Sequence, residues 1–238
     1  MFNGDIKFKG ISSKAYPLTV TTPPQITHPE KIVDKYSIPG RNGNLLGEVV
    51  SYGDAQITVS IALVASNTFT DGVSAYTEAY REVRQWLEGR GRLILGDAPD
   101  AFYEVSQVDI VTDDRTILRY GNLQAVFTVY PMEYLFSGET EISGGTVKNP
   151  GSTSYPLYKI TGNGNGVLTV NGKTMSYTVN GILYIDTQKW IAYDGQGQNM
   201  NPQLTGNYMN LKLVPGNNTV SASVGTLAIK PRWGINLS

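Results

Sequence analysis

The sequence predicts a mostly-β protein of two domains, an α+β domain followed by an all-β domain. Apolar and polar residues alternate over residues 57–63 and again over residues 123–129, which is the period of a half-buried strand. Between them, residues 74–88 carry the apolar stripe of an amphipathic helix. After Ser137, charged residues become rare and short apolar runs are separated by Asn-Gly and Asp-Gly pairs, which favour the turns of antiparallel sheets.

The helix expected over residues 74–88 has a start signal, a stop signal and a buried face. Ser74 is a good N-cap residue, and Gly89 suits the left-handed position that follows a helix. The apolar residues recur at the spacing i, i+3, i+4, i+7 and i+11. They are Tyr76, Ala79, Tyr80, Val83 and Leu87. One such helix packed on a sheet forms a compact first domain.

The length of 238 residues is sufficient for two domains of common size, about 100–150 residues each. We place the boundary within residues 137–151, so that residues 1–138 form the N-terminal domain and residues 139–238 the C-terminal domain. The second domain is expected to be a sandwich of short strands. Its turns are expected at residues 163–166, at Asn171-Gly172, at Asn180-Gly181 and at Asp194-Gly195.

The charge balance and the absence of cysteine exclude several classes of function. Nineteen basic residues against 20 acidic ones give a net charge of −1, and the arginines of residues 81–92 are interleaved with glutamates. Sequence-specific nucleic-acid binding is therefore not expected. With no cysteine, thiol catalysis, disulfides and thiolate metal sites are excluded. No signal peptide and no apolar run of membrane-spanning length is visible, so we expect synthesis in the cytoplasm and no membrane insertion.

The residues that could carry catalysis are few and do not form a recognisable set. His28 is the single histidine, and no nucleophile or carboxylate is positioned beside it in the local sequence. Two carboxylate pairs, Asp97 with Asp100 and Asp113 with Asp114, could serve a glycosidase, but we interpret both as turn residues. The sequence predicts no enzyme, no cofactor and no metal site.

Two further patterns have a structural and a functional interpretation. Residues 162–166 (Gly-Asn-Gly-Asn-Gly) look like a phosphate-binding loop, but a strand-like run follows instead of a helix, so we predict a hairpin loop. The 15 tyrosines and three tryptophans could stack on sugars. We favour core or interface positions for them, because aromatic residues are preferred in strands.

The order of these segments resembles the distal tail protein family of long-tailed (siphovirus-type) bacteriophages and prophages. In the first half the likeness rests on residues 38–43 (Ile-Pro-Gly-Arg-Asn-Gly), the strand 57–63, the helix 80–87, and residues 93–99, 102–105 and 127–134. In the second half it rests on Pro156, Ile185-Asp186 and residues 213–218 (Leu-Val-Pro-Gly-Asn-Asn).

The resemblance implies a structural protein that forms a hexameric ring at the tail tip, as a hub between the tail tube and the baseplate or adhesion proteins. The first domain, a sheet or split barrel with one helix, would build the ring around the DNA channel. The second, a galectin-like sandwich, would dock its neighbours. The implied partners are further copies of the chain, the tail tube, tail-associated hub or lysin proteins and receptor-binding proteins. The implied inter-subunit contact residues are Pro39, Gly40, Arg41, Asn42 and Gly43.

Two other functions stay open from the sequence. A carbohydrate-binding adhesin module is the main alternative, and the chain has no room for the sugar-binding insertion of larger family members. A hydrolase built on one of the carboxylate pairs is the weaker alternative.

Overall fold

The computed structural model describes residues 4–37, 39–40, 42–66, 68–70, 73–117 and 119–237. The chain forms two compact units. The first runs to Glu133 and takes in Leu237, and the second comprises Tyr134–Asn236. The expected boundary after Gly138 falls within the short 3₁₀ helix Phe136–Glu139 of the second unit. That the two units fold independently stays a prediction.

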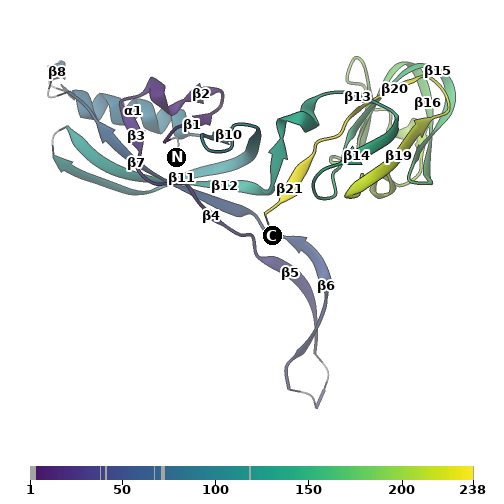
Figure 1. Ribbon diagram of the computed structural model, residues 1–238, viewed down its shortest axis with the longest axis horizontal. Coiled ribbons are helices and arrows are strands. Elements are labelled where there is room, and N and C mark those ends of the chain that lie inside the picture. The colour runs from purple at the N-terminus through teal and green to yellow at the C-terminus, as the bar shows by residue number, and fades with distance from the viewer. Residues whose placement is uncertain are drawn as a thin grey trace. The chain divides into compact units, whose positions relative to one another are not determined.

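The first unit contains one helix and eight strands of one sheet (Figure 1). Along the main path its strands are ordered β2 (Ile11–Ser12), β1 (Ile6–Phe8), β10 (Gly91–Leu95), β11 (Ala101–Ile117), β12 (Tyr120–Leu135), β7 (Ala55–Val64) and β3 (Leu18–Val20). In addition, β4 (Gln25–Thr27) pairs with β7. The short strand β21 (Gly234–Asn236) belongs to the residues of the second unit and pairs with β12, which ends in that unit. The ribbons β5–β6 (Lys31–Ser37 and Asn44–Tyr52) and β8–β9 (Phe69–Thr70 and Val73–Ser74) are separate two-stranded sheets.

The antiparallel pair β7–β12 contributes one apolar face of each strand to the core of this unit. Its register runs from Ala55 opposite Val129 to Val64 opposite Tyr120. Every second side chain of both strands is buried in the core: Ile57, Val59, Ile61 and Leu63 on β7, and Leu123, Ala125, Phe127 and Val129 on β12. Both predicted strands are therefore confirmed, because the period of two in the sequence matches the two faces of the sheet.

The helix α1 (Ala75–Leu87) packs on this sheet and closes the core. Ser74 caps it, since its side chain accepts a hydrogen bond from the backbone N–H of Thr77. Gly89 follows it with a left-handed φ of 89°. Of the predicted stripe Tyr80 is only half-buried, and Trp86 is buried instead, with its indole N–H donating to the Phe8 carbonyl at 3.2 Å.

The second unit is an eight-stranded sheet that wraps around its own core. Its strands are β13 (Ile142–Ser143), β14 (Gly145–Asn149), β15 (Leu157–Val170), β16 (Lys173–Asp186), β17 (Ile191–Asp194), β18 (Leu204–Thr205), β19 (Gly216–Ala222) and β20 (Thr226–Lys230). Together with the sheet of the first unit, they confirm the predicted mostly-β fold.

The long hairpin β15–β16 changes partners along its length. Near one end, residues 157–161 of β15 pair with β20, whereas residues 168–170 pair with β19. Strands that bend from one set of neighbours to another form the corners of sandwiches. At the bend Gly162 lies opposite Gly181, and a Cβ on Gly162 would lie 2.8 Å from the Cα of Gly225.

Two of the predicted turns of the second unit are wrong for this reason. Residues 163–166 and Asn180-Gly181 lie within β15 and β16, where small residues let the strands bend and approach other backbone. Asn171-Gly172 does form the hairpin turn, with φ of 50° and 76°. Because the two long strands each have 14 residues, the expectation of short strands is also wrong for them.

A buried ion pair holds the end of β16. Arg232 donates from Nη1 and Nη2 to the two carboxylate oxygens of Asp186 at 2.8 and 2.9 Å, and Asp186 is 2% exposed. The backbone N–H groups of Gln188 and Lys189 donate to the same carboxylate. Burial by itself would raise the pKa of Asp186, but the Arg232 guanidinium and these amides outweigh it and hold that pKa below its usual value.

We predict that Val83→Asp destabilises the protein by about 3 to 5 kcal/mol, because it leaves an uncompensated charge in the core. Val83 is fully buried, whereas Gln85 on the same helix is exposed. Gln85→Asp is the matched control and is expected to change the free energy of unfolding by less than about 1 kcal/mol. Urea unfolding measures both. Equal losses of stability would show that the helix buries a different face.

We predict that Asp186→Asn costs about 3 to 5 kcal/mol near neutral pH, because it leaves the Arg232 charge without its partner. A lowered pKa in the folded state gives stability above the unfolded pKa of about 3.9, which is lost as the pH falls through the folded pKa. The difference between variant and wild type should therefore shrink as the pH falls below about 4. The control is Glu141→Gln in the exposed pair with Lys159. A difference that does not change with pH would contradict the prediction.

Candidate functional site

The ribbon β5–β6, which we call the arm, extends away from the sheet of the first unit (Figure 1). Its pairing runs from Lys31 opposite Tyr52 to Ser37 opposite Asn44, with register shifts on either side of Val33. At its base, the N–H of Gly53 donates to the carbonyl of Glu30 at 2.9 Å. The arm is thus a hairpin held by its own ladder and anchored at one end.

The predicted inter-subunit residues lie at the tip of the arm. Pro39, Gly40, Asn42 and Gly43 are all exposed. Gly40 and Gly43 both have a φ of 82°, a conformation that glycine adopts without strain. Arg41 lies outside the described residues. The tip therefore lies at the far end of the arm, and its contact with another subunit stays a prediction.

The arm exposes large apolar side chains that the core does not use. Ile32 is 50% exposed and Tyr36 is 58% exposed. The ring of Tyr36 lies across Gly47 of the opposite strand, so closely that a Cβ on Gly47 would come within 3.1 Å of its Cε2 atom. An isolated two-stranded ribbon is marginally stable at best in water, and exposed apolar area adds to its need for a partner. These properties make the arm a candidate assembly surface.

The residues considered for catalysis lie on separate segments of the first unit. Asp97 and Asp100 are in the turn between β10 and β11, as predicted. Asp113 and Asp114 lie within β11, so their interpretation as turn residues is wrong. The strand β11 is hydrogen-bonded to β12 in the sheet, which favours an extended backbone over a turn. His28 bonds through Nδ1 to the carbonyl of Leu237. Among the described residues, no group of three or more potential metal ligands occurs.

Two buried tyrosines with raised pKa values donate hydrogen bonds within the two units. Burial raises the pKa of Tyr103, and its hydrogen bond to Glu133 at 2.7 Å raises it further. Burial likewise raises the pKa of Tyr158, whose hydroxyl donates to the Leu211 carbonyl at 2.7 Å. Both phenols therefore stay protonated hydrogen-bond donors at neutral pH, which is a structural role.

The tryptophans divide between core and surface. Trp86 and Trp233 are buried, and Trp190 is 56% exposed at the turn after β16. Trp190 has a φ of 57°, which is unusual for a residue with a large side chain. Within the described chain, no helix is long and apolar enough to cross a membrane.

Comparison with known proteins identifies the fold through structure alone. No protein-family model matches the sequence, and no curated protein matches it. Among solved structures, the chain is similar to the Dit protein (gp 19.1) of phage SPP1, described as a paradigm of the hub adsorption apparatus in phages that infect Gram-positive bacteria. The TM-score is 0.73 at 14% sequence identity, over 94% of this chain and 96% of that chain. The chain has the fold of a Dit protein, from the first unit through the second.

Proposed function

We propose that this chain is a distal tail protein, the structural hub of a phage tail tip. The observation that carries the proposal is the structural match to SPP1 Dit, which extends over nearly the whole length of both proteins. A match to only one unit would have left the other free for an unrelated task. The likeness in residue order described above points to the same family, although the sequence identity is low.

The finer role that we propose is a hexameric ring. The first unit builds the ring around the DNA channel and meets the tail tube, and the second unit docks tail-associated hub or lysin proteins and receptor-binding proteins. The protein would be made in the cytoplasm of the bacterial host and act in the virion at the tail tip. The role is structural and requires no catalytic group.

The proposed inter-subunit contact is the arm with its tip, Pro39, Gly40, Arg41, Asn42 and Gly43. A ring needs a contact between two different surfaces of each copy, repeated around a closing axis. An arm that leaves the body of the unit supplies one of these surfaces. Its exposed Ile32 and Tyr36 supply apolar area to bury there.

We predict that the purified chain forms rings, alone or with its tail tube partner. Light scattering should give six copies per particle, and negative-stain microscopy should show a closed ring. A chain that stays monomeric at high concentration and with tail partners, and that binds glycans as a monomer, would instead support the carbohydrate-binding adhesin.

We predict that shortening the arm weakens assembly without destabilising the monomer. Replacing residues 36–45 by Asn-Gly joins Lys35 to Leu46, which are already opposite each other, through a two-residue turn. Because the arm forms its own sheet, the midpoint of thermal unfolding should stay close to that of the wild type. The control variant keeps the arm intact and replaces the exposed Met209 of the second unit by Ala. An arm-shortened chain that forms rings as readily as this control would exclude the arm as a contact.

A further inference from the structure

One edge of the sheet of the first unit lacks a neighbouring strand. Among the strands that the structure describes, β11 pairs with β10 and β12 alone. The pairing with β10 reaches Val105, which lies opposite Gly91 at the start of β10. From residue 106 to Ile117, the outer edge of β11 therefore has no described strand beside it. Such an edge presents a row of backbone donors and acceptors to an incoming strand.

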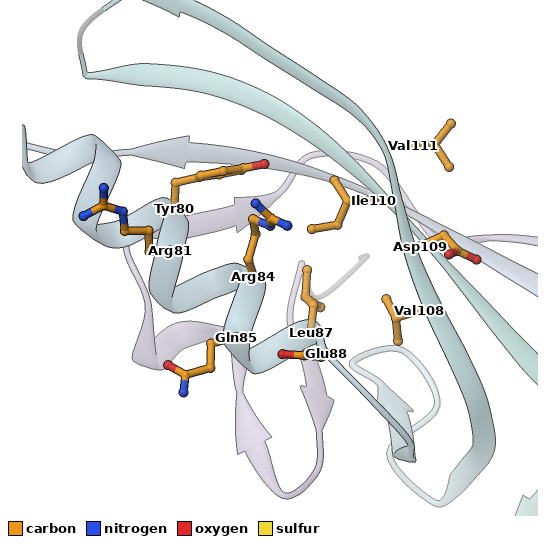
Figure 2. Close-up of a pocket in the computed structure, with 10 residues that line it drawn as sticks. All are labelled: Tyr80, Arg81, Arg84, Gln85, Leu87, Glu88, Val108, Asp109, Ile110 and Val111. Atoms are coloured by element: carbon orange, nitrogen blue, oxygen red, sulfur yellow. The ribbon is translucent and has the colours of Figure 1, made fainter.

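A groove runs between this edge and α1 (Figure 2). Its volume is about 690 Å³. Tyr80 and Leu87 of α1 face Val108 and Ile110 of β11 across it. Tyr80, Val108 and Ile110 are partly buried and pack against the core of the unit. The groove thus has an apolar floor that continues the core out to the open edge.

The rim of the groove is charged with both signs. Arg81 and Arg84 come from the helix, and Arg84 lies over the ring of Tyr80, with 5.8 Å between its Cζ atom and the ring centroid. Glu88 ends the helical side, and Asp109 lies on the strand side. An apolar floor with a charged rim suits a partner segment that is itself amphipathic.

We propose that this groove binds the arm of a second copy of the chain, which adds a strand to the open edge of β11. This inference rests on the proposed ring function and names the surface that receives the arm. Strand addition supplies main-chain hydrogen bonds along the edge, and alternate side chains fill the groove. Both the arm and the edge lack strand partners on their outer sides, and none of the residues lining the groove comes from the arm.

The arm matches the groove in length and chemistry. β5 has seven residues and β6 has nine, within the 12 positions from residue 106 to Ile117. The exposed side chains Ile32 and Tyr36 would meet the apolar floor. Lys31, Asp34 and Lys35 are exposed on β5 and offer both signs of charge to the rim. Because arm and groove are different surfaces of one unit, the contact is head-to-tail, which generates a ring when the rotation closes.

The absence of cysteine from the chain allows a direct test by cross-linking between copies. Two full-length variants are mixed, Ser37→Cys on the arm and Val111→Cys at the groove, and treated with a short bismaleimide. Ser37 is exposed and Val111 is 63% exposed, so neither change disturbs the core. The matched control replaces Val111→Cys by Thr19→Cys, an exposed position on β3 at the opposite end of the same sheet. Each variant treated alone measures cross-links between identical positions.

The expected result is several-fold more cross-linked dimer from the Ser37→Cys and Val111→Cys mixture than from the control mixture. Adding Tyr36→Ala to the arm variant should lower that yield. If rings form and Thr19→Cys cross-links as well as Val111→Cys, the groove is not the site that receives the arm. The same holds if rings form and neither variant cross-links. In both cases the proposed ring function would be unaffected. A protein that forms no rings and no cross-links, even with its tail partners, would refute both proposals.

Discussion

The register of β7 against β12 is the constraint on which the first unit depends. Over ten residue pairs, one face of both strands is apolar and buried, so a slip of one strand by one residue would turn the apolar side chains of that strand to solvent. The other elements attach to this pair. β3 and β4 add to β7, β11 adds to β12, and α1 covers the apolar face. None of the arm's described side chains belongs to this core, and the distal part of β11 contributes to it only through the partly buried Val108 and Ile110.

Two parts of the first unit that are not paired into its sheet on both sides are suited to assembly. The arm forms a ribbon of its own, and the outer edge of β11 stays open beyond Val105. A groove that was built for a small molecule would converge polar groups on one point. Here the polar groups are spread along a rim on both sides of an apolar strip, the arrangement that an extended chain segment requires. The proposed function thus rests on the arm, an open strand edge and an apolar groove, and it requires no catalytic group.

The sequence predicted those parts of the fold in which one face is buried and the other is not. The helix 74–88 and the strands around residues 57–63 and 123–129 were found because burial imposes a period. The arm was not found as a ribbon, since β5 is exposed on both faces and carries no alternation; its tip was indicated only by the family resemblance. The glycines of β15 and β16 were taken for turns, because a residue that permits a bend within a strand is the same residue that permits a hairpin. The open edge of β11 depends on where β10 ends in space, which no local pattern encodes.

The sheet edges of the two units differ, and this difference supports the proposal that the first unit carries the contact between copies. In the second unit the edge strand β17 is covered by its own loop, since Asp194 N–H donates to the Gln198 carbonyl and Met200 N–H donates to the Ala192 carbonyl. The edge strand β14 has only five residues and carries the exposed Lys148, a charge that discourages pairing with another chain. In the first unit no described loop covers residues 106–111, where Val111 is strongly exposed and Asp109 is the one charged residue. An edge left open beside an apolar groove favours aggregation of a monomer, whereas in the ring that we propose each such edge would be covered by the next copy.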